Sequence, residues 1–387
     1  MCARKILSGL ILCLCCKMSL AAVTVGSCRP DRHSYSTISA AIAEAQAGGV
    51  VDVCPGTYAE QLEIDKPLTL RGIDGTPVIV GPATGLNQLP AGSGFYPQVF
   101  VNNAGDEVRL LNLSIDGSNA LFNVDGEVGG LDLFCPEGAV SNFVGVYIVD
   151  TPGTLENINV SNHFGDSFPG GFGEPQLIPN CGSGIVFHGT GRSIVRNSTV
   201  SDVGLYGIFS DGDLMADRNT VSGGNGPCGI GIEIGTGNTL CNAGTAAAIG
   251  NIINNTITGT VAFENTIGIQ GGDLVKDNNV QGSIYGISGA GNVMKNTLQN
   301  NAISISGITR VFDNQVSSAP TYFDPACSGF CNPVPTVGVD FACSDSDHVM
   351  KNGIQGVGIG FANLPKGDAV PKKNTFNSVQ TVSTSCQ

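Results

Sequence analysis

The chain has 387 residues and a formal net charge of −14, and only 13% of its residues are charged. This acidity argues against nucleic acid and anionic membranes as partners, because both require a basic surface. The 55 glycines, together with 41% hydrophobic residues and no Trp, favour tightly turned β-structure with a core over disorder.

The first 21 residues have the pattern of a secretory signal peptide. Arg4 and Lys5 provide the positive start, Ile6–Cys16 the apolar run, and Ser19-Leu20-Ala21 a small-x-small cleavage site. The apolar run is too short to span a bilayer. Cleavage after Ala21 removes three cations, which changes the net charge from −14 to −17. The mature chain, residues 22–387, is therefore predicted to lie outside the cytoplasm, secreted or periplasmic.

Cysteine usage supports export. Ten of the 14 cysteines follow the predicted cleavage site, and an even number favours disulfides over a metal site. The expected pairs are Cys28 with Cys54, Cys135 with Cys181, Cys228 with Cys241, and pairs among Cys327, Cys331, Cys343 and Cys386. One alternative remains for Cys28, because Val25-Gly26-Ser27-Cys28 has the form of a lipoprotein box, which predicts a lipid anchor. The unlipidated protein is preferred, since this box lies far from the apolar run.

Residues 36–49 predict a short capping helix. Ser36 is the expected N-cap, and Gly48-Gly49 is expected to end the helix. The apolar face comprises Ile38, Ala41, Ile42 and Ala45. Such a helix would cover the open end of a solenoid, whose first coil is expected to have strands at 50–53, 61–64 and 68–70.

A repeat fills the rest of the chain: Gly, a short apolar strand, a polar turn, and a second strand next to an Asn. Copies begin at Gly184, Gly207, Gly229, Gly268 and Gly286; the spacings are 23 and 22 residues among the first three and 18 residues between the last two. This pattern predicts an all-β fold, a single-stranded right-handed parallel β-helix with rungs about 4.8 Å apart, that forms one domain over 22–387.

The repeat also assigns faces and loops. The side chains expected inside are Ile185, Phe187, Ile208, Ile230, Ile232, Ile269 and Ile287. The asparagines expected to stack in a ladder are Asn157, Asn197, Asn219, Asn278, Asn296, Asn314 and Asn352. The segments expected as loops, which in solenoids often line one binding face, are 81–105, 116–140, 162–183, 235–250 and 317–336.

Three stretches open the predicted mature chain: Tyr35–Ile42, Val53–Glu60 and Leu68–Gly72. They resemble the opening of pectin-lyase-like β-helix proteins, such as pectin methylesterases and periplasmic NosD-like proteins. The resemblance implies the fold. It implies no catalytic residue, because the methylesterase Gln-Asp pair and Trp are absent and only His188-Gly189 matches the polygalacturonase motifs.

A candidate catalytic site follows from aligning the repeats on Gly-Ile. His188, Asp211 and Glu233 then fall in one outward column, about 4.8 Å apart per rung. Two carboxylates at that spacing can act as acid and base in retaining glycoside cleavage, with His188 steering protonation. The register is ambiguous, because Gly229-Ile230-Gly231-Ile232 permits a two-residue slip that moves Glu233 off the column. Solvated polar residues are the alternative interpretation.

Further residues complete the candidate binding site. An apolar wall for a sugar face is expected from Phe164, Phe168 and Phe172. No metal site or cofactor is predicted. Ca²⁺ is an alternative at Asp211, Asp213 and Asp217, or at Asp345, Asp347 and His348, although turn stabilisation explains both clusters better. His33 and His163 are expected at the surface.

The functional hypothesis is a monomeric, exported β-helix protein that binds a polysaccharide or cell-surface glycan and, as a further step, cleaves it as a hydrolase or lyase. The absent catalytic signatures leave its status as an enzyme open. One alternative is a non-catalytic surface, structural or adhesive protein. Another is a NosD-like periplasmic accessory protein.

Overall fold

The part of the chain that the structure describes is a long β-solenoid. The computed structural model describes residues 22–118, 120–124, 127–129, 143–163, 182–189, 191–222, 229–235, 250–259, 266–308, 310–319, 321–322, 333–343 and 348–386. The predicted signal peptide lies outside these residues. Among them, no helix has the length and apolar character needed to cross a membrane.

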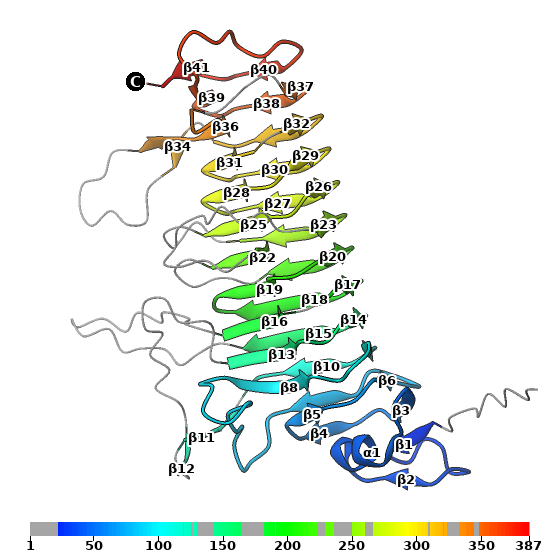
Figure 1. The fold of residues 1–387 in the computed structure, drawn as a ribbon. Helices are drawn as coiled ribbons and strands as arrows, with labels where there is room; N and C mark the ends of the chain where they lie inside the picture. Colours follow the sequence, from blue (N-terminus) through cyan, green and yellow to red (C-terminus); the bar gives the residue numbers. More distant parts are fainter. Residues whose placement is uncertain are drawn as a thin grey trace, which may run out of the picture.

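Three long parallel sheets run along the solenoid axis, and each coil contributes one strand to each sheet (Figure 1). Sheet A contains β2 (Ser34–Tyr35), β1 (Val23–Val25), β3 (Gly49–Val53), β6 (Leu68–Gly72), β9 (Val108–Leu111), β14 (Gly153–Glu156), β17 (Ser193–Arg196), β20 (Leu214–Asp217), β23 (Gly250–Ile253), β26 (Leu274–Lys276), β29 (Asn292–Met294), β32 (Arg310–Phe312) and β37 (Val349–Met350). Sheet B contains β4 (Thr57–Ala59), β7 (Val78–Val80), β10 (Ser114–Asp116), β15 (Asn159–His163), β18 (Thr199–Val203), β21 (Thr220–Ser222), β24 (Thr256–Thr258), β27 (Asn279–Gln281), β30 (Thr297–Gln299), β33 (Gln315–Ser317), β38 (Gly353–Gln355) and β40 (Thr375–Asn377).

Sheet C completes the coils and is the sheet that carries the candidate site. It contains β5 (Leu62–Ile64), β8 (Tyr96–Asn102), β13 (Phe143–Val149), β16 (Gly182–His188), β19 (Tyr206–Ser210), β22 (Ile230–Ile234), β25 (Ile267–Gly271), β28 (Tyr285–Ser288), β31 (Ile303–Ser306), β36 (Val337–Asp340), β39 (Ile359–Leu364) and β41 (Thr381–Ser385). Two hairpins, β11 (Phe122–Val124) with β12 (Glu127–Gly129) and β34 (Thr321–Tyr322) with β35 (Val334–Pro335), lie beside the coils.

The right-handed parallel β-helix predicted from the repeat is confirmed, since parallel strands joined by such crossovers wind right-handed. Three loop predictions need correction. The segment 81–105 includes β8, which is a full strand of sheet C, whereas 116–140 and 317–336 include the β11–β12 and β34–β35 hairpins. None of these strands follows the Gly-Ile pattern, so the repeat did not mark them.

The interior is a set of apolar columns. Ile185, Ile208, Ile232, Ile269 and Ile287 pair in succession along sheet C and are fully buried. The prediction that Ile230 also points inside is wrong, because Ile230 pairs with Tyr206 and belongs to a second, outer cluster.

The corner before each inward Ile is what sets this register. Gly207 and Gly231 are neighbours there: a Cβ on Gly207 would lie 2.4 Å from the Gly231 carbonyl oxygen. Only glycine tolerates this backbone approach. The residue equivalent to Gly207 is therefore Gly231, two positions after the Gly229 that the repeat selected.

The asparagine ladder is confirmed, with a shifted membership. The stacked residues are Asn219, Asn255, Asn278, Asn296, Asn314, Asn352 and Asn374, and each accepts from the preceding rung through its Oδ1. Asn157 and Asn197 were wrongly included. They stand one position earlier, at left-handed φ values of 54° and 51°, a conformation that Asn tolerates better than most residues. Ser198 takes the ladder position in the coil of Asn197 and accepts the N–H of Ile158, which takes that position in the coil of Asn157.

We expect Asn296→Ala to destabilise the fold by about 3 kcal/mol. Asn296 is fully buried; its Oδ1 accepts both the backbone N–H and Nδ2 of Asn278, and its Nδ2 donates to Val275 and Asn314. Alanine leaves these buried partners unsatisfied. Urea denaturation measures the change, with exposed Gln299→Ala as the control expected within about 0.5 kcal/mol of wild type. Equal loss in both variants would mean that the ladder adds nothing specific.

The capping helix α1 (Ile38–Glu44) forms as predicted, with small corrections at its ends. Ile38, Ala41, Ile42 and Ala45 are buried against the first coil. The N-cap is Thr37, whose side chain accepts the Ala40 N–H, and not Ser36. The helix ends at Glu44, before Gly48. Figure 1 shows α1, β1 and β2 together at one end of the solenoid.

Two disulfides support the predicted oxidising compartment. Cys28–Cys54 is confirmed, and Cys343–Cys386 is one of the pairs expected near the C-terminus. Because the Cys28 sulfur is bonded to Cys54, it has no valence for a thioether lipid, so the lipid-anchor alternative is wrong. The other predicted disulfides, which involve Cys135, Cys181, Cys228, Cys241, Cys327 and Cys331, lie outside the described residues.

Candidate functional site

The outward face of sheet C carries two neighbouring columns of side chains. The first contains Phe100, Tyr147, Val186, Phe209, Glu233 and Gln270, paired rung by rung. The second lies two residues further along each strand and contains Val149, His188 and Asp211. The candidate site is the region where these columns meet.

His188 and Asp211 lie side by side, as the sequence predicted. The His188 Nδ1 is 2.5 Å from Asp211 Oδ2, and the Gly189 N–H donates to Asp211 Oδ1 at 2.8 Å. The carboxylate thereby fixes one orientation of the imidazole and leaves its Nε2 as the proton-accepting nitrogen. The His188 side chain is 59% exposed and Asp211 20% exposed, so both are accessible to a ligand.

Tyr147 and Asp150 extend this group. Burial, and to a lesser degree the charges of Asp211 and Asp150, raise the pKa of the Tyr147 hydroxyl. Asp150 also approaches the turn after His188, where a Cβ on Gly189 would lie 2.4 Å from its Oδ1. Two carboxylates, one imidazole and one phenol therefore share a small area at the ends of β13, β16 and β19.

Glu233 on β22 is the most perturbed acid of the site. The residue is only 2% exposed, and its Oε2 has no hydrogen-bond partner. This burial raises the pKa of the carboxyl to about 7. Glu233 pairs with Phe209 on one side and Gln270 on the other, so it stands among uncharged neighbours.

The three residues do not form the single column that the Gly-Ile alignment predicted. Glu233 is one rung and two residues away from Asp211, because the two-residue slip at Gly231 occurs. With rungs about 4.8 Å apart and about 6.6 Å between alternate residues of a strand, the two Cα positions are about 8 Å apart. The two residues are therefore further apart than the adjacent-rung pair from which retaining cleavage was expected.

An aromatic cluster that the sequence pattern did not predict adjoins the acids. Tyr147 stacks on Phe95 and Phe100 with ring centroids 5.0 and 5.7 Å apart, and Tyr206 stacks on Phe209 at 4.9 Å. The outward parity of Phe100, Tyr147 and Phe209 on strands of sheet C was the available signal for these three; Phe95 precedes β8, and Tyr206 precedes the corner glycine. The predicted wall of Phe164, Phe168 and Phe172 lies outside the described residues.

The carboxylates proposed for Ca²⁺ are separated. Asp211 binds His188, whereas Asp217 on sheet A binds Arg218 at 2.8 Å and accepts from Asn254 at 3.1 Å. Within the described parts of the chain, no three His, Cys, Asp or Glu residues are placed to hold a metal ion. Asp345 and Asp347 lie outside those parts, so the site expected there with His348 stays a prediction.

Comparison with known proteins finds similarity of fold alone. No protein-family model and no curated protein matches the chain. PfbA, a surface adhesin of Streptococcus pneumoniae, aligns over 94% of this chain and 93% of its own, with a TM-score of 0.56 and 13% identity. A polygalacturonase from Erwinia carotovora aligns over 99% of this chain and 97% of its own, with a TM-score of 0.47 and 12% identity. The A-module of mannuronan C-5 epimerase AlgE4 from Azotobacter vinelandii aligns over 87% of this chain and 89% of its own, with a TM-score of 0.45 and 16% identity. The predicted resemblance to pectin-lyase-like β-helix proteins is confirmed for the fold.

Proposed function

We propose that this protein binds an extracellular polysaccharide along sheet C and hydrolyses it, with Glu233 as the proton donor and Asp211 as the base. The observation that carries the proposal is the state of Glu233, a buried carboxyl with an unpartnered oxygen and a pKa near 7. Such a carboxyl group is still protonated in a large fraction of the molecules at neutral pH, and it can donate this proton to a leaving oxygen.

The proposed reaction is a single displacement. Glu233 transfers its proton to the glycosidic oxygen while the bond from that oxygen to the anomeric carbon breaks. Asp211 takes a proton from a water molecule, whose oxygen attacks the anomeric carbon from the opposite face. A water between the two carboxyl groups gives inversion at the anomeric carbon, and the Cα separation of about 8 Å, wider than one rung, supports this geometry. His188 is a positioning residue that holds Asp211, and the Phe95 and Tyr147 rings offer apolar surface to a sugar face.

A second candidate, a binding protein without catalysis, is favoured by the 2% exposure of Glu233. In that case the His188–Asp211 pair would bind sugar hydroxyls and Glu233 would remain enclosed. The NosD-like accessory role stays a prediction.

Incubation with a panel of neutral and acidic polysaccharides, with and without Ca²⁺, separates these functions. We expect saturated fragments by mass spectrometry and an inverted anomer by NMR. Unsaturated uronates would identify a lyase, and binding without products would support the second candidate. The absence of both products and binding would refute a polysaccharide function.

For the hydrolase we expect Asp211→Asn to lower turnover by about 10²-fold to 10⁴-fold, because a general base is lost. The fold should be retained, since Asn still accepts the Gly189 N–H. Asp213→Asn, two residues away, removes the same charge from the same turn and is the matched control. Initial rates of fragment release measure both variants; comparable rates for Asp211→Asn and Asp213→Asn would remove Asp211 from the mechanism.

A further inference from the structure

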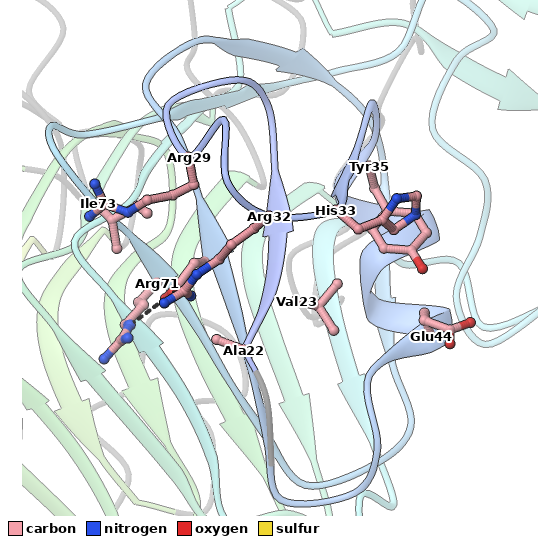
Figure 2. Close-up of a pocket in the computed structure, with 10 residues that line it drawn as sticks. Ala22, Val23, Arg29, Arg32, His33, Tyr35, Glu44, Arg71 and Ile73 are labelled. Carbon is pink, nitrogen blue, oxygen red and sulfur yellow. Dashed lines mark hydrogen bonds and ion pairs between the residues drawn. The ribbon is translucent and has the colours of Figure 1, made fainter. Parts of the chain in front are cut away.

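A large pocket lies at the N-terminal end of the solenoid, away from sheet C. It has a volume of about 810 Å³ and is formed by residues of β1, β2, α1, β3 and β6 with their connecting loops. We call it the cap pocket; it is lined by Ala22, Val23, Arg29, Arg32, His33, Tyr35, Glu44, Asp52, Arg71 and Ile73 (Figure 2). Its volume is that of a site for a small molecule or one unit of a polymer.

A buried carboxylate holds two arginines at one side of the cap pocket. Asp52 has a side chain that is only 6% exposed, and its Oδ1 accepts from Arg71 Nε at 2.6 Å. Its Oδ2 is 3.7 Å from Arg32 Nη1. Arg71 thus uses its Nε–H, while its terminal nitrogens remain for a ligand, and both arginine side chains are almost half exposed. The Arg71 guanidinium, fixed through its Nε–H, suits bidentate binding of a carboxylate, and Arg32 lies beside the same carboxyl group.

A third arginine comes from the same loop as Arg32. The Arg32 N–H donates to the Arg29 carbonyl, and the Cys28–Cys54 disulfide ties this loop to the chain just after Asp52. Arg29 pairs with Asp74 at 2.8 Å, but both side chains are well exposed. An exposed pair of this kind is weak enough to be exchanged for a ligand.

The local charge contrasts with that of the whole protein. The lining contains three arginines against Asp52 and Glu44, which is a balance of +1 in a chain of net charge −14. Figure 2 shows Arg29, Arg32 and Arg71 on one side and Glu44 on the opposite side, so an anion has a defined place beside the arginines.

The opposite side offers surface for a ring. His33 and Tyr35 meet edge to face with centroids 5.0 Å apart, and Val23 lies between them and the arginines (Figure 2). A pyranose ring can pack its C–H face on such an aromatic surface while a carboxylate on the ring reaches the arginines.

We propose that the cap pocket binds one carboxylated sugar unit, a uronate, of an acidic polysaccharide. This site goes beyond the proposed function, because it uses other residues at another end of the molecule and requires no catalysis at Glu233. It would hold an acidic chain that the strongly negative remainder of the protein repels.

Binding of a uronic acid trisaccharide to the purified full-length mature protein tests the proposal by calorimetry. Arg32→Gln is the preferred variant, because the contact of Arg32 with Asp52 is long and its removal should leave the fold intact. We expect it to weaken binding about 10-fold to 100-fold. Arg310→Gln removes one exposed arginine from β32 at the other end of sheet A and should bind within about 2-fold of wild type, the matched control for net charge.

Three further measurements decide the result. The neutral trisaccharide with CH₂OH in place of each carboxylate should bind at least about 10-fold more weakly. Gln299→Ala, an exposed position on β30 outside both sites, should bind the uronate as wild type does. Equal affinity for both sugars, or an unchanged affinity in Arg32→Gln, would overturn the proposal. Inorganic phosphate binding as tightly as the trisaccharide would also overturn it, because the pocket would then recognise charge without sugar. None of these outcomes depends on polysaccharide cleavage, which is measured separately.

Discussion

Glu233→Gln is expected to lower polysaccharide turnover by about 10²-fold to 10⁴-fold and at the same time to stabilise the folded protein above pH 7. The substitution keeps the shape of the side chain and removes the acidic proton. Turnover falls because glutamine cannot donate a proton to the leaving oxygen. Stability rises because the fold no longer holds an ionisable group in a place that disfavours its charge.

The sign of the stability change follows from the pKa. Burial raises the pKa of Glu233 from 4.5 to about 7 in the folded protein. Below pH 4.5 the carboxyl is neutral in both folded and unfolded protein, and no stability is lost. As the pH rises from 4.5 to 7, the unfolded protein ionises first, so folding becomes less favourable. The cost reaches about 3 kcal/mol above pH 7, and the Glu233→Gln variant avoids it.

Urea denaturation at pH 4 and pH 8 measures this effect. We expect the variant to match wild type at pH 4 and to exceed it by up to about 3 kcal/mol at pH 8. Glu63→Gln is the control, because Glu63 starts the same column at an exposed position. A less stable Glu233→Gln variant at pH 8 would mean that the carboxylate supports the fold, and the proton-donor role would fail with it. A more stable Glu233→Gln variant would instead indicate that the wild-type protein keeps Glu233 at a cost in stability, as functional sites often do.

The sequence predicted the fold well because the solenoid repeats one local rule. Most coils combine inward Ile or Val, a corner glycine and a ladder Asn, so successive copies reinforce the same period. The cap helix was found for a similar reason, since Ile38, Ala41, Ile42 and Ala45 have a helical period. Its exact N-cap was missed because Ser36 and Thr37 are both able to cap.

The candidate site was only half predictable. His188 and Asp211 meet because Gly184 and Gly207 are equivalent, whereas Glu233 was misplaced because Gly229 and Gly231 both fit the repeat. Only the backbone approach at the corner distinguishes these two glycines. The cap pocket had no sequence signal, because Arg71 is far from Arg32 in the chain and follows no period.

His163 is the second residue for which a large effect is expected, and the prediction that it lies at the surface is wrong. It is fully buried at the end of β15. Asn162 has a left-handed φ of 62°, which reverses the alternation of the strand and turns His163 inward; Val203, its partner on β18, follows Asp202 with φ 54° in the same way. Strand periodicity alone places residue 163 outside.

One tautomer of His163 is fixed by Gln98. The Gln98 Nε2 donates to the carbonyls of Ile79 and Asp116 at 2.8 and 3.2 Å, so its Oε1 faces His163 and accepts from Nε2 at 3.0 Å. Burial lowers the pKa of His163 to about 3, although Asp116 and a hydrogen bond at Ser161 oppose the shift. The imidazole is therefore neutral throughout the physiological range.

We expect His163 to make the fold sensitive to acid. Below pH 6.5 the unfolded protein binds a proton at this residue and the folded protein does not, so stability falls by about 1.4 kcal/mol per pH unit until about pH 3. The full loss is about 5 kcal/mol. His163→Gln keeps a donor for Gln98 Oε1 but packs less well against Phe143, so it should be about 1–3 kcal/mol less stable at pH 7.

Urea denaturation of wild type and His163→Gln from pH 7 to pH 3.5 measures the contribution of the histidine to stability, because the carboxylates titrate alike in these two proteins. The stability deficit of His163→Gln should shrink as the pH falls and reverse before pH 3.5, whereas the exposed control His348→Gln should follow wild type throughout. Parallel curves for wild type and His163→Gln would show that the buried imidazole accepts a proton without cost. A reversal would instead make His163 a determinant of the lowest pH at which the solenoid stays folded, and hence of the environments in which the protein can act.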